Sequence, residues 1–203
     1  MAQTRYLDDV YDIAERDGLE TLYDKWASTY DDELTENSYV TPARIARAMA
    51  QTGCRGPVLD VGCGTGLSGL ALTQAGYDVI DGCDISEAMV AEARAKGVYR
   101  TLTVTDPDKP LPVSPGSYPT IAAVGVVTVG AAPADLLDDL ADALAPGGRL
   151  AFSFNDHALA EGSYVAKLGE LLSRGFSLRF REYGPHIRAR DLGSTVYVIE
   201  KRA

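Results

Sequence analysis

Apolar residues near the start of the chain recur at the spacing of an α-helix. Residues at i, i+3, i+4 and i+7 share one helical face, so each such stripe predicts an amphipathic helix. Two stripes occur before residue 37, one on either side of Gly18: Leu7, Val10, Tyr11 and Ala14, and then Leu19, Leu22, Tyr23 and Trp26. A third helix is predicted with Thr41 as its N-cap and Pro42 in the first helical position, ending near Gly53.

From residue 57 onward, short apolar runs alternate with helical stretches. The runs predict five strands, at 58–61, 78–83, 100–104, 120–127 and 149–154. Helices are predicted between them at 67–75, after the N-cap Ser86 as far as Gly97, and at 133–144. Such alternation is typical of a parallel sheet with helices on both faces.

The end of the chain has a different pattern. After a helix near 164–173, two β-rich runs at 176–183 and 195–200 are joined by only 11 residues, which show no helical spacing. A parallel crossover needs a dozen or more residues and usually a helix. The two runs therefore predict an antiparallel pair.

The charge of the chain lies mainly at its N-terminus. The net charge is −10, and residues 1–36 contain 11 acidic and 3 basic residues. This segment is either a solvated acidic face or part of the entrance to a site. Nucleic-acid binding and membrane-surface helices both depend on basic surfaces, so we expect neither nucleic acid nor a membrane as partner.

The composition sets further expectations. The longest apolar stretch, 121–132, is too short to cross a bilayer, and the first residues contain no apolar signal core, so we expect a cytoplasmic protein. Three Cys and two His residues offer no zinc spacing and no disulfide framework. We therefore expect no metal site.

A glycine loop between the first predicted strand and its helix is the most informative motif. It reads Asp60-Val-Gly62-Cys-Gly64-Thr-Gly66, and Asp84 follows the second strand. Glycines allow a backbone to approach a ligand closely, and a carboxylate after the second strand can accept both hydroxyls of a ribose. Residues 64–69 also satisfy the dinucleotide pattern G-x-G-x-x-G, but Asp60 at the strand end suits a cationic ligand and would repel a pyrophosphate.

The segment 58–66 closely resembles the first motif of the class I S-adenosylmethionine-dependent methyltransferases, and the similarity in strand order extends from about residue 37 to the end. The resemblance implies an α/β fold: a Rossmann-like three-layer sandwich with a mostly parallel seven-stranded sheet and an antiparallel C-terminal strand. It implies S-adenosylmethionine as cofactor, a methyltransferase domain at 37–203 and an N-terminal helical cap at 1–36. Residues 23–31 also resemble the aromatic cap of a small-molecule subgroup.

The resemblance further implies cofactor-binding roles. Asp60 would organise the methionine amino end, and Gly62 and Gly64 would let the loop approach it. Asp84 would hold the ribose hydroxyls, although an Asp here is also common in a turn that leads into a helix. Ile85 would lie against the adenine.

Five further positions complete the implied cofactor site. Asp106 would accept from the adenine amino group, or would belong to an ordinary Asp-Pro turn. Val124 and Gly125 would border the cofactor at the end of the fourth strand. Trp26 and Tyr30 would lie on the cofactor side of the cap, or would belong to a buried helical stripe.

The expected function is in-line methyl transfer from S-adenosylmethionine to a small molecule. A sulfonium methyl group is already activated, so a nucleophile held about 3–3.5 Å away can suffice. If a general base is needed, the candidate is His157, just after the fifth strand, which also suits a surface loop; His186 is expected to be structural. The alternatives are an NAD-dependent oxidoreductase and a non-catalytic S-adenosylmethionine-binding protein.

Overall fold

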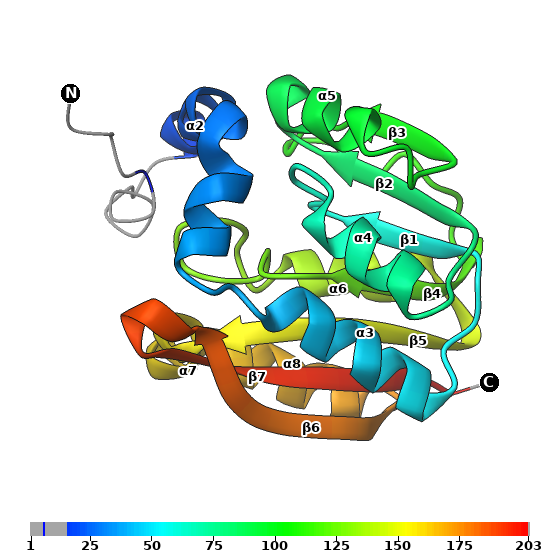
Figure 1. Cartoon of the computed structure of the whole chain (residues 1–203). Helices are drawn as coiled ribbons and strands as arrows, with labels where there is room; N and C mark the ends of the chain where they lie inside the picture. The colour runs from blue at the N-terminus through cyan, green and yellow to red at the C-terminus, as the bar shows by residue number, and fades with distance from the viewer. Residues whose placement is uncertain (1–5, 7–15, 203) are drawn as a thin grey trace.

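The computed structural model describes residue 6 and residues 16–202 (Figure 1). Seven strands form one sheet in the order β3-β2-β1-β4-β5-β7-β6. The strands are β1 (Val58–Val61), β2 (Ile80–Asp84), β3 (Thr101–Val104), β4 (Tyr118–Ala123), β5 (Leu144–Asn155), β6 (Phe176–Ile187) and β7 (Leu192–Lys201). The first five pair in parallel, whereas β7 runs antiparallel to both β5 and β6. This confirms the predicted mostly parallel, seven-stranded, Rossmann-like sheet.

Helices cover both faces of the sheet, as Figure 1 shows. The described helices are α2 (Arg16–Glu36), α3 (Thr41–Thr52), α4 (Leu67–Gln74), α5 (Glu87–Ala95), α6 (Leu136–Ala143), α7 (Asp156–Glu161), α8 (Ser163–Ser173) and the 3-10 helix η1 (Arg188–Arg190). Helices α3 and α4 pack on one face, and α6 and α8 on the other. Helix α2 packs against α5 and stands beside the carboxyl ends of the parallel strands.

Two apolar clusters fill the space between the sheet and its helices. Alternate residues of a strand point to opposite faces, so neighbouring residues of β1 belong to different clusters. Leu59 packs with Phe152 and Phe154 toward α6 and α8, whereas Val58 packs with Ile45 toward α3. The sheet is therefore buried on both faces, as the near-continuous apolar runs predicted.

A third cluster attaches α2 to the rest of the protein. Leu22, Trp26 and Leu34 pack against Met89 of α5 and Ile187 of β6. The predicted stripe around Trp26 is thus confirmed as a buried face. The earlier stripe, residues 7–14, lies outside the described residues.

The observed helix starts correct two sequence predictions. Helix α2 begins at Arg16 and passes through Gly18, so this glycine does not separate two helices. The N-cap of α3 is Val40 rather than Thr41. Thr41 is instead the first residue of α3, and its hydroxyl lies 2.7 Å from Nδ1 of His186.

Several strand and helix boundaries also differ from those predicted. β4 ends at Ala123 instead of residue 127, and β5 begins at Leu144, which pairs with Tyr118 of β4 before a register shift that leads to Arg149. The short helix α7 has no apolar stripe in the sequence; its N-cap is Asn155, whose side chain accepts a hydrogen bond from the Ala158 amide.

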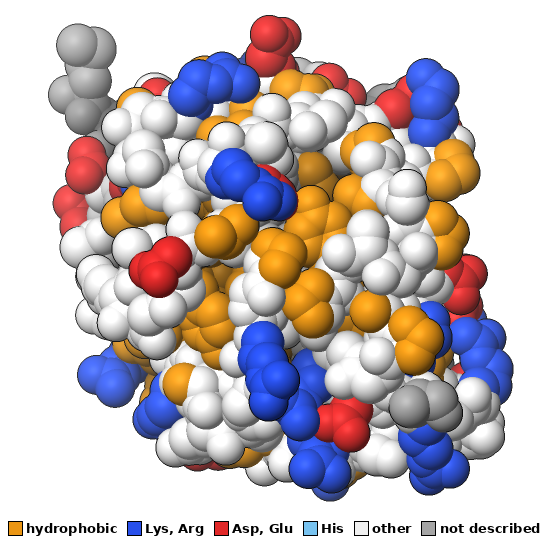
Figure 2. All heavy atoms as spheres, turned by 90° about the vertical axis from the view of Figure 1, so that its right-hand side faces the viewer, with side chains coloured by type: hydrophobic (Ala, Val, Ile, Leu, Met, Phe, Trp, Pro, Cys, Tyr) orange, Lys and Arg blue, Asp and Glu red, His pale blue; other side chains and the backbone are white. Residues whose placement is uncertain are grey.

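The face at the amino ends of the strands is turned away from α2. Figure 2 shows hydrophobic side chains in its centre and basic side chains along its lower part. Among the described residues, no helix is long and apolar enough to cross a membrane, and no cluster of His, Cys, Asp and Glu suits a metal ion. The candidate site lies on the opposite side, where the carboxyl ends of the strands meet α2.

Candidate functional site

A cavity of about 330 Å³, here called the large cavity, lies at the carboxyl ends of β1, β2 and β4. In open α/β sheets this crevice is where ligands bind. Predicted site residues from five separate segments lie in its wall: Tyr30, Gly62, Gly64, Asp84, Ile85, Asp106, Val124 and Gly125. The fold therefore brings eight of the ten predicted cofactor-binding residues to one cavity.

The glycine loop forms the floor of the large cavity. Gly62 and Gly64 have φ values of +67° and +52°, in the left-handed region that favours glycine. A Cβ on Gly62 would lie 2.3 Å from Cγ2 of Val126, so the close packing of the loop requires glycine here. A Cβ on Gly64 would meet no atom within 4 Å.

Asp84 is held by the loop that it faces. Its Oδ2 accepts a hydrogen bond from the Gly64 amide at 2.8 Å, and its Oδ1 accepts one from the Ser86 amide at 3.0 Å. A carboxylate has about four acceptor sites, so about two remain for a ligand in the cavity. Burial raises the pKa of Asp84 above its usual value, and the amides of Ser86, Gly64 and Ile85 oppose that shift.

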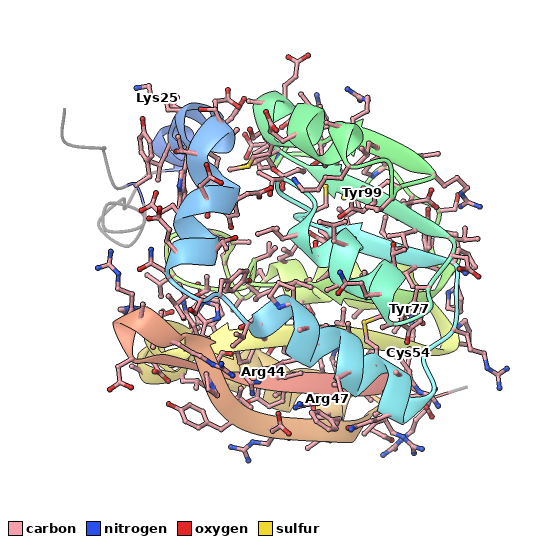
Figure 3. The ribbon with its side chains drawn as sticks, viewed as in Figure 1. Lys25, Arg44, Arg47, Cys54, Tyr77 and Tyr99 are labelled. Atoms are coloured by element: carbon pink, nitrogen blue, oxygen red, sulfur yellow. The ribbon has the colours of Figure 1, made fainter. Side chains whose placement is uncertain are left out.

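Asp60 is fully buried and is not part of the cavity wall. Its Oδ2 accepts hydrogen bonds from Ser68 at 2.6 Å and from Tyr99 at 2.7 Å; Tyr99 is labelled in Figure 3. Its Oδ1 has no partner among the residues that the structure describes. Burial is the main cause that raises the pKa of this carboxyl to about 6.

The raised pKa of Asp60 predicts a pH-dependent stability. Because the folded protein holds this proton more tightly than the unfolded chain, the contribution is present below about pH 4 and is lost as the pH rises to about 6. A shift of about two pKa units corresponds to about 3 kcal/mol. We therefore expect the free energy of unfolding of the native protein, relative to Asp60→Asn, to fall by about that amount between pH 4 and 7.

Denaturant titrations of both proteins at each pH would measure this difference. The comparison with the variant matters because His186 gives an opposite slope: its pKa is lowered to about 4, mainly by burial. A difference that stays flat, or rises with pH, would contradict the prediction.

Asp106 lies in an exposed turn at the mouth of the large cavity. Its Oδ1 accepts from the Asp108 amide at 3.0 Å, and its Oδ2 pairs with Lys109 at 2.7 Å. The hydrogen bond from Lys109 is the main cause that lowers the pKa of Asp106. The Asp-Pro turn considered for Asp106 is therefore present, and the residue also lines the cavity.

A second cavity of about 40 Å³, here called the small cavity, adjoins the large one. The two share wall residues Tyr23, Tyr30, Gly125 and Ala131. The other residues of the small cavity are Trp26, Leu34, Tyr39, Thr128, Val129, Gly130, Asn155, His186 and Ile187. Trp26 is thus brought to the small cavity and not to the large one.

Polar contacts hold α2 over the two cavities. Asp31 accepts a hydrogen bond from the Thr65 hydroxyl in the glycine loop and pairs with Lys96 at 2.7 Å. Asp24 accepts from the hydroxyl of Ser86, the N-cap residue of α5. Part of the N-terminal acidity therefore binds the rest of the protein, while other acidic side chains of α2, such as Asp32, are exposed.

The two histidines occupy different environments. His157 is exposed on α7 and lies in the wall of neither cavity, because the chain turns into a helix immediately after β5. His186, near the end of β6, is buried and lines the small cavity. The pairing of β6 with β7 was predicted, whereas the packing of α3 against both strands, which brings His186 beside α3, was not.

Comparison with known proteins supports the same family as the motif. The family described as "Methyltransferase domain" matches residues 58–148. Methyltransferase-like protein 27 of Homo sapiens is 33% identical over 63% of this chain and 54% of its own length. The chain thus spans about half the length of that relative.

Two further comparisons differ in the named substrate. The 18S rRNA (guanine(1575)-N(7))-methyltransferase of Saccharomyces cerevisiae is 36% identical over 34% of this chain and 26% of its own length. The crystal structure of magnesium protoporphyrin IX methyltransferase from Synechocystis PCC 6803, solved with bound S-adenosylmethionine, has a TM-score of 0.63 at 23% identity and covers 99% of both chains. The described residues therefore share the fold of this methyltransferase, whereas the substrate class differs among similar proteins.

The large cavity fits the cofactor that the resemblance implies. Asp84 retains acceptor sites, Ile85 and Val124 supply apolar walls, and the space beside Gly64 is open. S-adenosylmethionine carries ribose hydroxyls, an apolar-faced adenine and a flexible cationic end, which these features suit. The motif, the family match over residues 58–148 and the fold together support a class I S-adenosylmethionine-dependent methyltransferase, with S-adenosylmethionine as the cofactor.

Proposed function

We propose that this protein transfers the methyl group of S-adenosylmethionine to a small molecule. The observation that carries this proposal is the pair of adjoining cavities, which share Tyr30 and Gly125 in their walls. The large cavity suits the cofactor, and the small cavity offers a separate place for a methyl acceptor. A protein that only binds the cofactor has no need of that second cavity, so the pair favours an enzyme.

We propose roles in cofactor binding for predicted site residues in the wall of the large cavity. Asp84 would accept hydrogen bonds from the ribose hydroxyls, and Ile85 would lie against the adenine. Asp106 would accept from the adenine amino group, provided that its carboxylate exchanges its contact with Lys109. Gly62 and Gly64 would let the backbone approach the methionine part.

Asp60 would act indirectly, by holding the glycine loop in place. It is buried outside the cavity wall, and its Oδ1 has no partner among the described residues. Its negative form would favour a cationic amino group nearby, and it fixes Ser68 at the start of α4. We therefore propose that Asp60 positions the loop rather than touching the cofactor.

Methyl transfer requires little of the protein beyond positioning the two reactants and excluding water. When bound, S-adenosylmethionine supplies an activated methyl group on a sulfonium. Tyr30 and Gly125 line both cavities, so donor and acceptor would meet beside them, and α2 contributes Tyr30 to this boundary. Holding a nucleophile in line at about 3–3.5 Å supplies most of the required rate effect.

The charge around the large cavity favours a small, non-polyanionic substrate. Its wall contains six acidic side chains but only one basic side chain, Lys109. The acidic residues are Glu20, Asp84, Asp106, Asp108, Asp135 and Asp139. Nucleic acids bind through Lys and Arg contacts to phosphate, so this wall disfavours them. One similar protein is an rRNA methyltransferase, so the experiment must also test RNA as an acceptor. The charge of the wall is the reason that we propose a small molecule.

The oxidoreductase alternative is not supported. The matched family and the relatives compared above are methyltransferases, and no dehydrogenase is among them. Asp60 lies directly before the glycine loop, where a buried carboxylate disfavours a pyrophosphate.

Thermal unfolding with added ligands tests the proposed function. We expect S-adenosylmethionine and its demethylated product to raise the melting temperature, because a ligand at 100 times its Kd stabilises the folded state by about 2.7 kcal/mol. NAD at the same concentration is the control and should give no shift. A shift with NAD alone would refute the proposal, and a methyl-transfer screen against small-molecule and RNA acceptors would decide the substrate class.

A further inference from the structure

His186 lines the small cavity and is 6% exposed, yet the proposed function assigns it no part. Resting on that proposed function, we infer that His186 binds the methyl acceptor as a hydrogen-bond donor, through Nε2–H, and not as a general base. The acceptor molecule would then carry an oxygen that accepts a hydrogen bond, such as a carbonyl or carboxylate oxygen, at this end of the small cavity.

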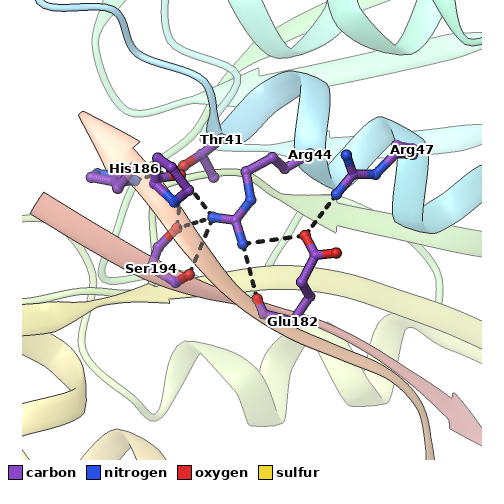
Figure 4. A network of polar contacts seen from close by, with 7 residues as sticks. Thr41, Arg44, Arg47, Glu182, His186 and Ser194 are labelled. Carbon is purple, nitrogen blue, oxygen red and sulfur yellow. Dashed lines mark hydrogen bonds and ion pairs between the residues drawn. The ribbon is translucent and has the colours of Figure 1, made fainter. Parts of the chain in front are cut away.

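Hydrogen bonds connect Arg44, Ser194, Thr41 and His186 (Figure 4), and Arg44 determines which atom donates in each. A guanidinium only donates, so Arg44 Nη1 donates to the Ser194 hydroxyl oxygen at 2.9 Å. The Ser194 proton is then directed to Thr41 Oγ1 at 3.3 Å. Thr41 in turn donates to Nδ1 of His186 at 2.7 Å. Nδ1 is therefore an acceptor, and the proton of the neutral ring is on Nε2.

The opposite arrangement leaves a buried proton without an acceptor. If Nδ1–H donated to Thr41, the Thr41 proton would go to Ser194, and the Ser194 proton would have no acceptor among the described residues. Ser194 is fully buried, so this loss is not compensated by water. The network thus fixes one tautomer.

The charges around His186 keep the ring neutral. Burial and the positive charge of Arg44 lower its pKa to about 4; Asp156 opposes this, and His157 adds slightly to it. A neutral ring with Nδ1 occupied by Thr41 has no free lone pair to remove a proton. Such a ring can only donate from Nε2, which has no partner among the described residues.

A second N–H group in the same wall points to the same ligand chemistry. Trp26 is 2% exposed, lines the small cavity, and its Nε1 has no acceptor in the described part of the chain. Asn155, also in the wall, already uses its side-chain oxygen to accept from Thr128 and from the Ala158 amide. The small cavity therefore has buried donors in excess, which an oxygen-bearing ligand would satisfy.

Nitrogen-15 NMR of the histidine rings tests the tautomer directly. At pH 7 we expect Nδ1 of His186 to be unprotonated and Nε2 to carry the proton; the only other histidine, exposed His157, serves as the internal reference. Thr41→Val should abolish the preference for Nε2–H, whereas Thr52→Val, in the same helix, should leave it unchanged. A protonated Nδ1 in the unaltered protein would overturn the inference.

A pair of small probes tests the ligand chemistry. In protein saturated with S-adenosylhomocysteine, we expect acetate to shift the His186 Nε2–H and Trp26 Nε1–H signals. Methylammonium, which only donates, should shift neither at the same concentration. His186→Leu should weaken acetate binding, followed at Trp26, by about tenfold or more.

The two proposals fail in different ways. If acetate shifts neither signal, or if methylammonium shifts them equally, the inference about His186 is overturned. If S-adenosylhomocysteine does not bind at all, as calorimetry on the same sample would show, the proposed function fails while the tautomer measurement still stands.

Discussion

Asp84→Ala is expected to weaken S-adenosylmethionine binding by about 100-fold or more. The variant removes the two hydrogen bonds that we propose Asp84 accepts from the ribose hydroxyls. Each is charge-assisted and contributes about 1.5–3 kcal/mol, and 1.4 kcal/mol corresponds to a factor of ten. It also releases the amides of Gly64 and Ser86, which the carboxylate holds at 2.8 and 3.0 Å. Isothermal titration calorimetry with the cofactor measures the change.

Asp78, which lies just before β2, provides a matched control for Asp84 at the end of the same strand. Asp78 is exposed and lines neither cavity, so Asp78→Ala should leave the Kd unchanged. Circular dichroism of both variants separates a local loss of affinity from unfolding. An Asp84→Ala protein that folds and binds with unaltered affinity would refute the ribose role.

Trp26→Ala is expected to lower the free energy of unfolding by about 3–5 kcal/mol, as truncation of a large buried aromatic side chain does. Trp26 is 2% exposed and belongs to the cluster that joins α2 to Met89 and Ile187. Its ring also packs on Tyr23 and Tyr30, with centroids at 6.1 and 4.5 Å. Urea titration followed by circular dichroism measures the loss.

Val165→Ala is the control for this truncation. Val165 lies on α8 and is 44% exposed, so its replacement should change the free energy of unfolding by no more than about 0.5 kcal/mol. A loss of less than about 1 kcal/mol for Trp26→Ala would contradict the packing of α2 on the rest of the protein.

The strand order was predictable because strong local patterns and chain connections specify it. An apolar run followed by glycines located β1, a second apolar run located β2, and the short link between the last two runs predicted their antiparallel pairing. Boundaries were less predictable, since they depend on tertiary contacts. Gly18 is tolerated within α2, and Thr41 lies inside α3 because its hydroxyl binds a residue 145 positions away.

In the candidate site, too, residues marked by a local sequence pattern were predictable, whereas residues placed by tertiary contacts were not. The glycine loop and Asp84 follow strands directly, so the sequence places them correctly at the carboxyl ends. His157 also follows a strand, but α7 turns it outward. His186 and Tyr39 approach each other only through folding of the C-terminal strands, with ring centroids 5.1 Å apart, and no local pattern marks them. Their place in the small cavity therefore needed the three-dimensional structure.

The position of Trp26 gives the protein a built-in optical probe. It is the only tryptophan among 203 residues, and it borders the small cavity but not the large one. Selective excitation of indole fluorescence therefore reports on the small cavity, where we propose that the methyl acceptor binds, with little contribution from the 11 tyrosines. Spectral changes on adding acceptor candidates to cofactor-loaded protein would reveal occupancy without any label or any assay of turnover.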